Sequence, residues 1–360
     1  MTRRVPADSR SPVTIRDVAR ASGVSIGTVS RAFKRQGGLT EATREQILRA
    51  ARDLGYDTAN LRAAKLRRVS FLLRRQHTAL TANPFYSHVL HGVEDACRAR
   101  GLTLHYGSLS SDERGTGEHD VGEQAVGERA ADTVRRHQSD GLLCVGFFEA
   151  ALLSELRALG LPLVLVDSFA PGLPSVNSDN FGGAYQATRH LLASGRRRVA
   201  FLGGPDHFSI RERHLGYRQA LYDAGVPADP LLDVRRDPEG EEQGAAHAMR
   251  ALLALPAPPD AVFAFNDATA LLAMRTCQEE GLRVPQDIAF VGFDDITTAA
   301  HAHPPLSTVR VDKEALGRLG VELLLDRRRA AQSAVQQQAG QESLKVPVEL
   351  IVRESSAGAG

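Results

Sequence analysis

The stretch that decides the fold is VTIRDVARASGVSIGTVSRAF, residues 13 to 33. Its apolar side chains recur at helical spacing on both sides of Gly23, and a glycine there tolerates the left-handed backbone of a sharp turn. Thr14 and Asp17 have the spacing of a capping box, which predicts that a helix begins at Ile15. The stretch therefore predicts two short helices joined by a tight turn.

The second helix of this stretch should bury Val24, Val29 and Phe33 and present a hydroxyl-rich face to solvent. The outward positions are Ser25, Ile26, Gly27, Thr28, Ser30 and Arg31. A guanidinium can bond guanine O6 and N7 in the major groove, whereas hydroxyls and helix N-terminal amides hold phosphates. We therefore predict DNA binding, with Arg31 as the base reader and Ile26 suited to a thymine methyl. The alternative is a small helical hairpin whose polar face is only solvated.

A third helix should open at Thr40 and run to Leu54, which completes a helix-turn-helix domain over residues 13–58. Residues 1–70 contain 13 Arg and 2 Lys against 6 acidic residues, although the whole chain has 44 basic and 43 acidic residues. A basic N-terminal part on an acidic body is the pattern expected when only one module meets phosphate. Residues 1–12 are predicted to form a disordered basic arm.

From Val69 onward, short apolar runs alternate with amphipathic segments, which predicts parallel sheets with helices on both faces. The predicted strands are 69–73, 102–106, 142–145, 163–166, 199–202, 261–265 and 288–293, and the predicted helices include 86–100, 181–194, 213–224 and 268–280. The length suffices for an α/β body of two lobes, over residues 69–354, in addition to the DNA-binding domain. Residues 355–360 are assigned to a tail.

The stretch quoted above, followed by LTEATREQILRAARDLGYDTANLRAAKLRR at 39–68, resembles the headpiece and hinge of the LacI-type repressors. The resemblance continues to PVELIVRESS at 347–356. It implies a body with the periplasmic-binding-protein type I fold, in which the chain crosses between lobes near Asn180, near Val309 and near Gly340. It also implies a homodimer that binds a pseudo-palindromic operator on double-stranded DNA.

The resemblance gives residues 59–68 the role of a hinge helix that folds on DNA, with contacts from Asn60, Ala63 and Leu66 and a further contact from Thr14. Leu66 holds the position of a leucine that wedges into the minor groove and kinks the duplex. The alternative is that Leu66 packs the N-terminal domain on the body. Effector binding between the lobes would then shift the two hinges and control the affinity for DNA.

Ligands of open α/β sheets collect at the carboxyl ends of the strands. By resemblance, the effector-binding residues are Phe85, Asp167, Arg213, Asn266 and Asp294. Carboxylates, an amide, a guanidinium and an aromatic face suit a polyol, so the effector is predicted to be a carbohydrate. Asp267 and Asp295 are expected to be helix caps.

The sequence indicates no catalytic residues, no metal site and no cofactor, because phosphate-binding, nucleophile-elbow and metal-ligand patterns are all missing. Three cysteines without metal-ligand spacing favour a reduced, cytoplasmic protein, and neither a secretory signal nor a membrane span is found. A solute-binding protein with the same body fold is the alternative function. No apolar heptad follows the final strand, so we expect a dimer rather than a tetramer.

Overall fold

The computed structural model describes residues 13–33, 38–54, 66–75, 84–110, 123–235, 241–332 and 343–357. The chain divides into a small unit of residues 1–66 and 325–339 and a large unit of residues 67–324 and 340–360. The predicted arm and the hinge positions Asn60 and Ala63 lie outside the described residues. Among the described helices, none is long and apolar enough to cross a bilayer.

The N-terminal part of the small unit contains three described helices around one apolar core. They are α1 (Ile15–Ser22), α2 (Ile26–Phe33) and α3 (Glu41–Asp53). The core contains Val18, Ala19, Val29, Ala32, Phe33, Ile47 and Ala51. Alanine at three of these positions lets the helix backbones approach closely, so a small core suffices to fix their arrangement.

Local signals set the ends of these helices as predicted. The Thr14 N–H donates to the Asp17 carboxylate over 2.9 Å, and Gly23 has φ +66°, the left-handed conformation that stops α1. The Thr28 N–H donates to Ser25 Oγ over 3.1 Å, which caps α2. Because each end is fixed by its own residues, the turn between α1 and α2 is specified locally.

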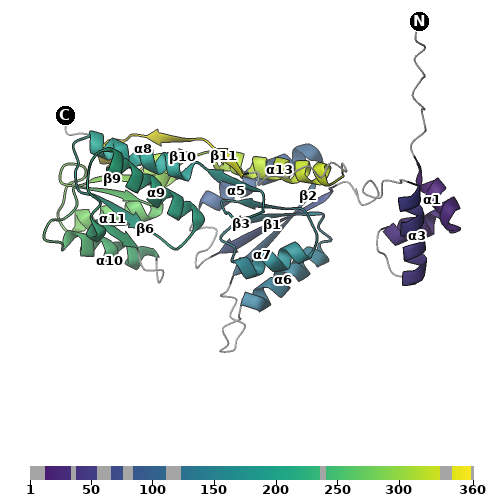
Figure 1. Ribbon diagram of the computed structural model, residues 1–360. Coiled ribbons are helices and arrows are strands. Elements are labelled where there is room, and N and C mark those ends of the chain that lie inside the picture. The colour runs from purple at the N-terminus through teal and green to yellow at the C-terminus, as the bar shows by residue number, and fades with distance from the viewer. Residues whose placement is uncertain are drawn as a thin grey trace, which may run out of the picture. The chain divides into compact units, whose positions relative to one another are not determined.

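The large unit contains two six-stranded sheets within its described residues, one in each lobe (Figure 1). The first sheet has the order β11-β5-β4-β3-β1-β2, with β1 at Arg68–Arg75, β2 at Thr103–Ser110, β3 at Gly141–Gly146, β4 at Leu163–Val166, β5 at Ser175–Ser178 and β11 at Ser343–Val346. The second has the order β12-β10-β9-β8-β6-β7, with β6 at Val199–Gly203, β7 at Asp233–Arg235, β8 at Ala261–Ala264, β9 at Ala289–Asp294, β10 at Ser307–Val311 and β12 at Val348–Ile351. Neighbouring strands are parallel except β10 and β12. The predicted fold class is confirmed.

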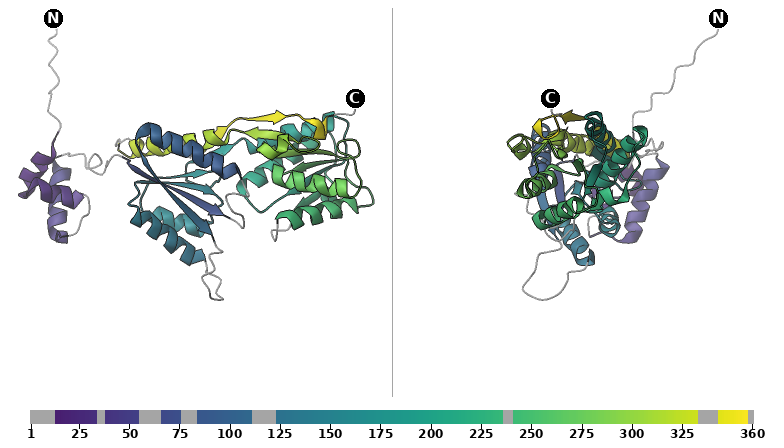
Figure 2. Two further views of the ribbon diagram at one scale, coloured as in Figure 1. Left: turned by 180° about the vertical axis from the view of Figure 1, so that it is seen from behind. Right: turned by 90° about the vertical axis from the view of Figure 1, so that its left-hand side faces the viewer.

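Helices cover both faces of the first sheet. On one face lie α6 (Glu123–Arg136) and α7 (Ala150–Ala158), and on the other lie α5 (Pro84–Arg100) and the start of α13 (Lys313–Gln332) (Figures 1 and 2). A Cβ atom at Gly92 of α5 would lie 2.1 Å from the Glu314 carbonyl oxygen, and one at Gly317 of α13 would lie 2.1 Å from that of Val89. Glycine at both positions is therefore required for the close packing of α5 on α13.

The second sheet has two pairs of helices against it. The first pair is α8 (Asn180–Ala193) with α9 (Phe208–Asp223), and the second is α10 (Glu241–Leu253) with α11 (Asp267–Glu279). A short helix, α12 (Thr297–Ala300), follows β9. A fully buried apolar cluster that includes Met249, Cys277 and Phe290 fills the space under the second pair, so each lobe has its own core.

The chain crosses between the lobes three times in its described part. The first crossing joins β5 to α8 at Asn180, and the second follows β10, close to the predicted Val309. The third lies at Pro347 between β11 and β12, so the prediction of a crossing near Gly340 is wrong by several residues. The physical reason is that β11 first adds to the first sheet as an edge strand before the chain leaves that lobe.

The predicted tail also begins too early. Ser355 and Ser356 are buried, and Ser355 Oγ donates to the Phe290 carbonyl oxygen over 2.7 Å. Ser356 Oγ donates to Ser307 Oγ over 2.7 Å. These two serines therefore belong to the packed second lobe, because their hydroxyls satisfy buried polar groups there.

Candidate DNA-binding and effector sites

The outward face of α2 is exposed as predicted. Ile26 is 45% exposed, and Arg31, Ser25 and Gly27 are exposed as well. Arg31 makes no hydrogen bond or ion pair with any other described residue. Around Gly27, the nearest atom to an added Cβ would be Ser25 Oγ at 3.8 Å, so space is open there. This face presents one long cation among short side chains, which is the shape that a base edge in the major groove requires.

The remaining predicted DNA contacts have different surroundings. Thr28 and Ser30 are half-buried on the flank of α2, and Thr14 is exposed at the start of α1. Leu66 is only 4% exposed. The Leu66 side chain is therefore buried, and its predicted role in the minor groove stays a prediction.

The second candidate site lies where the carboxyl ends of strands from both lobes meet. Asp167 directly follows β4, is 5% exposed and has φ +51°, a strained conformation for a residue with a side chain. Its carboxylate accepts from the Tyr86 hydroxyl over 3.0 Å and from Ser209 Oγ over 2.6 Å. Burial, and next the charge of Asp167, raise the pKa of Tyr86, so the phenol stays protonated and donates. Ser209 belongs to the second lobe, so Asp167 links the two lobes.

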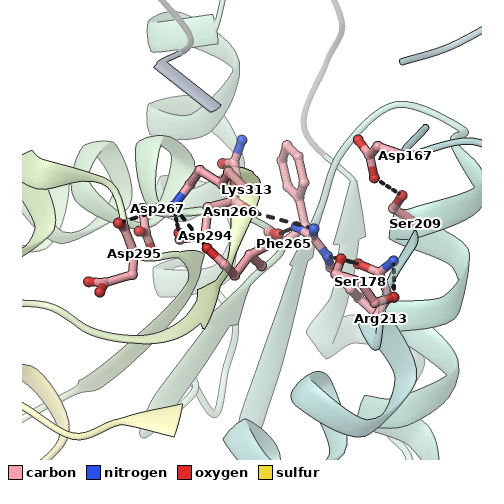
Figure 3. A network of polar contacts seen from close by, with 12 residues as sticks. Asp167, Ser178, Ser209, Arg213, Phe265, Asn266, Asp267, Asp294, Asp295 and Lys313 are labelled. Carbon is pink, nitrogen blue, oxygen red and sulfur yellow. Dashed lines mark hydrogen bonds and ion pairs between the residues drawn. The ribbon is translucent and has the colours of Figure 1, made fainter. Parts of the chain in front are cut away.

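Arg213 on α9 is the centre of the polar network in the second lobe (Figure 3). Its guanidinium donates to Asn180 Oδ1 over 2.9 Å and to the Phe265 carbonyl oxygen, and it forms an ion pair with Asp294 at 3.4 Å. Its charged carbon also lies 3.7 Å from the centroid of the Phe293 ring. Arg213 is 4% exposed, so these partners replace the water that its side chain loses.

Asp294 ends β9 opposite this guanidinium. Burial raises the pKa of Asp294 to about 6, although the charges of Arg213 and Lys313 act to lower it. The Lys313 ammonium donates to the main-chain carbonyl oxygen of Asp294. A carboxyl with this pKa accepts hydrogen bonds when it is ionised and can also donate one when it is protonated below about pH 6, and either form can bond a ligand hydroxyl.

Two of the five predicted effector residues have structural roles that the sequence did not show. The Asn266 side chain accepts from the Thr269 N–H over 2.9 Å, so it caps α11. Phe85 is 3% exposed and packs edge-on against Tyr86, with ring centroids 5.1 Å apart. From this helix the Tyr86 hydroxyl, rather than the Phe85 ring, reaches Asp167.

The prediction that Asp267 and Asp295 are helix caps is wrong. Asp267 is fully buried and accepts from Thr308 Oγ1 over 2.5 Å and from the Ile296 N–H over 2.8 Å. Asp295 instead joins two arginines, Arg310 and Arg353, each at 2.7 Å. Asp267 is the first residue of α11, whose cap is Asn266, so its carboxylate is free to bond Thr308 of β10. Asp295 bonds arginines of β10 and of the segment after β12 instead of a helix end.

Four further residues complete the site and were missed by the sequence analysis: Tyr86, Asn180, Ser209 and Lys313. Tyr86 and Ser209 lie at the starts of the helices that follow β1 and β6, and were within reach of the same reasoning. Asn180 and Lys313 lie at crossings between the lobes, and only the fold brings them to Arg213 and Asp294.

Comparisons with known proteins agree with this arrangement. Residues 14–59 match the family "Bacterial regulatory proteins, lacI family", and residues 188–356 match the "Periplasmic binding protein-like domain". The chain is 32% identical to the HTH-type transcriptional repressor CytR of Escherichia coli K12 over 353 residues, which covers 95% of this chain and 96% of CytR. It is 36% identical to the HTH-type transcriptional regulator CelR of Thermobifida fusca over 338 residues, covering 89% and 93% of the two chains.

Solved structures show the same likeness. The transcriptional regulator CelR–cellobiose complex superposes with a TM-score of 0.69 at 33% identity and covers 95% of this chain and 99% of that one. The lac repressor dimer bound to operator superposes with a TM-score of 0.67 at 24% identity and shares the fold. The relatives are transcriptional regulators that match over nearly their whole length. The chain therefore belongs to the lacI family of bacterial regulatory proteins.

Proposed function

We propose that this protein is a transcriptional repressor that reads operator DNA with α2 and is controlled by a small effector at the interlobe site. The observation that carries the proposal is the exposed face of α2, where Arg31 has no partner among the described residues. An exposed cation that bonds no other described residue can contact a base edge without breaking an interaction of the fold. In this proposal, Arg31 reads sequence, Ile26 contacts a thymine methyl, and the hydroxyls of Ser25 and Thr28 hold phosphate.

The operator is proposed to be pseudo-palindromic. Two identical copies of the chain would present two equal α2 faces, so the two half-sites must be related by the same twofold symmetry. Asn60, Ala63 and Leu66 are proposed to add contacts near the centre of the operator. Because the Leu66 side chain is buried, it must move before it can contact DNA. DNA binding is therefore proposed to be coupled to a rearrangement at Leu66.

The effector is proposed to be a carbohydrate. The carboxylates of Asp167 and Asp294 can accept hydrogen bonds from vicinal hydroxyls of a sugar. Arg213 donates to Asp294 and so fixes the orientation of this carboxylate. Relatives named for sugars support this class: one solved relative is a complex with cellobiose, and the ribose operon repressor of Escherichia coli K12 is 34% identical. A ligand bound to both lobes would stabilise the arrangement of the lobes that it contacts. If the ligand changes the affinity for the operator, the operator changes the affinity for the ligand by the same factor.

A solute-binding protein with the same body fold is the alternative, and the three-helix unit with its basic charge counts against it. We also propose that the protein has no catalytic activity and acts in the cytoplasm, where the DNA is. Asp167 accepts from the hydroxyls of Tyr86 and Ser209, and Arg213 pairs with Asp294. This arrangement suits binding rather than activation of a nucleophile.

Selection from a pool of random duplexes with the full-length protein tests the proposal. Repeated rounds of capture should enrich one sequence with twofold symmetry, and monosaccharides or disaccharides should change its retention. A pool that stays random after selection, while the protein remains folded and dimeric by sedimentation, would contradict sequence-specific binding.

A further inference from the structure

A buried arginine, Arg74, lies at the carboxyl end of β1. It is only 7% exposed. Its Nε and Nη2 atoms donate to the Glu149 carboxylate over 3.3 and 3.0 Å. The Nη1 atom is also buried, yet it has no hydrogen-bond partner among the described residues. Buried polar groups are normally hydrogen-bonded, so this nitrogen lacks an acceptor that a ligand can supply.

The strand register puts Arg74 in line with the proposed effector site. Arg74 of β1 pairs with Gly146 of β3, and Val145 of β3 pairs with Val166 of β4. Gly146 and Asp167 are therefore neighbours at the same edge of the sheet, and Arg74 lies on the other side of Gly146. Because adjacent strands are about 4.8 Å apart, the main chains of Arg74 and Asp167 are separated by about 10 Å. One small ligand can therefore reach both side chains.

Gly146 brings the end of β1 close to the hydroxyl that bonds Asp167. A Cβ atom at Gly146 would lie 3.1 Å from the Arg74 carbonyl oxygen and 3.3 Å from the Tyr86 hydroxyl. Gly146 also has φ +84°, a conformation that residues with a side chain rarely adopt. The main chain of Arg74 and the Tyr86 hydroxyl thus meet around a residue without a side chain, so Arg74 belongs to the same site as Asp167.

A second buried donor approaches Gly146 from the other lobe. His207 Nδ1 accepts from the Ser209 N–H over 3.3 Å, so in the neutral ring the proton is on Nε2. Burial lowers the pKa of His207 and so favours the neutral ring, although the charge of Asp167 acts to raise it. The Nε2 atom is buried and makes no hydrogen bond of normal geometry with a described residue, although the Gly146 main chain lies near the ring. Two buried donors, one from each lobe, thus lack acceptors beside Gly146.

From these two donors we propose that the effector carries an anionic group, a carboxylate or a phosphate, that binds Arg74 Nη1 and His207 Nε2. The inference rests on the proposed carbohydrate-binding function of the same site. An anionic group offers two or more acceptor oxygens, so it can satisfy a donor from each lobe at once, and charged oxygens accept more strongly than a neutral hydroxyl. Asp167, Arg213 and Asp294 would hold the hydroxyls of the sugar.

Glu149 positions Arg74 for this role. Its carboxylate bonds the edge of the guanidinium that carries Nε and Nη2, which leaves Nη1 on another edge of the planar group. The Glu149 side chain is 22% exposed, whereas that of Arg74 is 6% exposed, so the carboxylate keeps more of its water than the guanidinium does. Glu149 therefore fixes the guanidinium and also competes with a ligand anion for its charge.

Isothermal titration of the full-length protein with matched sugars tests the proposal. The probes are glucose, galactose and mannose, each with its uronic acid and its 6-phosphate. At least one acidic compound should bind about tenfold or more tightly than its neutral parent, the ratio expected from an added hydrogen bond to a charged group. A uronic acid as the tightest ligand identifies a carboxylate, and a 6-phosphate identifies a phosphate. Neutral sugars that bind as tightly as their acidic forms would overturn the inference but leave the carbohydrate proposal intact, whereas no binding by any probe would contradict both.

Two substitutions with opposite expected signs locate the anion. Arg74→Gln should weaken binding of the acidic compound about tenfold or more and leave the affinity for the neutral parent within about twofold. Glu149→Gln should instead strengthen binding of the acidic compound, by about threefold or more, because it removes the competing carboxylate. Arg211→Gln is the matched control, since Arg211 is an exposed arginine paired with Asp206.

The two substitutions can also contradict the proposal. Equal weakening of the acidic and neutral compounds by Arg74→Gln, with unchanged circular dichroism, would show that Arg74 only supports the site and would overturn the inference. If Arg74→Gln does not fold, Glu149→Gln decides alone, and an unchanged or lower affinity for the acidic compound would overturn the inference.

Discussion

Arg31 on α2 and Arg213 on α9 are the same residue type in opposite environments. Arg31 is exposed and bonds no other described residue, whereas Arg213 is 4% exposed and has partners from three segments and an aromatic ring. An exposed guanidinium can bind DNA without breaking an interaction within the protein. A buried guanidinium cannot be removed without leaving its buried partners unpaired. The proposed DNA-binding site thus uses an arginine that the fold does not need, whereas the proposed effector site uses one that the fold does need.

The largest expected effect is on the buried side of this comparison. Arg213→Ala should lower the free energy of unfolding by about 3 to 5 kcal/mol, because it leaves Asp294 and the Phe265 carbonyl group buried without their partner. Urea denaturation followed by circular dichroism measures this. Arg211→Ala is the control, since Arg211 lies on the same helix and has an exposed ion pair with Asp206. Equal stability of the two variants would show that Arg213 is not structurally required.

The pH dependence of Asp294 tests the same network. Its pKa is raised from 3.8 to about 6, so between these values the folded protein holds a proton that the unfolded chain releases. The stability from this group is therefore fully present below about pH 4 and is lost as pH rises through 6, by about 3 kcal/mol at most. Asp294→Asn should remove this dependence, which unfolding of both proteins from pH 4 to 7 would reveal as a changing difference. A constant difference would contradict the raised pKa.

A substitution of Asp140 tests how the start of β1, where the large unit begins, is held to the segment before β3. Its carboxylate accepts from the main-chain N–H groups of Arg67 and Arg68 over 3.1 and 2.9 Å. Asp140→Ala should lower stability by about 1 to 2 kcal/mol and weaken the response of operator affinity to effector. Asp132→Ala is the control because the partner of Asp132 among the described residues is Arg135, in an exposed ion pair. If both variants keep the full effector response in a DNA-binding titration, the hydrogen bonds to Asp140 have no part in the coupling between effector and operator binding.

The smallest expected effect is on the exposed side. Gly27→Ala should stabilise α2 by about 1 kcal/mol, since alanine favours the helix and the added Cβ would meet only Ser25 Oγ at 3.8 Å. Thermal unfolding should therefore shift upward, while operator affinity should fall if DNA approaches this position closely. A lower melting temperature would mean that the face of α2 is more crowded than the structure indicates.

The sequence was most informative where short-range signals decide the structure. Thr14, Gly23 and Ser25 fix the ends of α1 and α2 from within a few residues, so the three-helix unit could be predicted in detail. Buried strands such as β4 were equally clear, because they are continuous apolar runs. By contrast, β5 has the sequence SVNS and was not predicted, since its polar residues are buried only because neighbouring strands cover them.

The effector site was predicted in part for the same reason. Asp167 directly follows β4 and Asp294 is the last residue of β9, so their place at the sheet edge follows from chain order. Asp295 and Asp267 were misassigned because their partners, such as Arg353 and Thr308, are distant in sequence. An Asp between a strand and a helix is most often a helix N-cap, so the local sequence favours that assignment. Only the folded structure shows that these two carboxylates bond residues distant in sequence.

The most direct test of the account is the affinity of the full-length protein for its selected operator and for a scrambled duplex, measured by fluorescence anisotropy at fixed salt. Arg31→Ala should weaken operator binding by about 1 to 3 kcal/mol and leave the affinity for the scrambled duplex nearly unchanged. Arg49→Ala, which removes an exposed arginine from α3, should preserve the ratio of the two affinities. Equal weakening of both duplexes by Arg31→Ala would contradict base reading by α2.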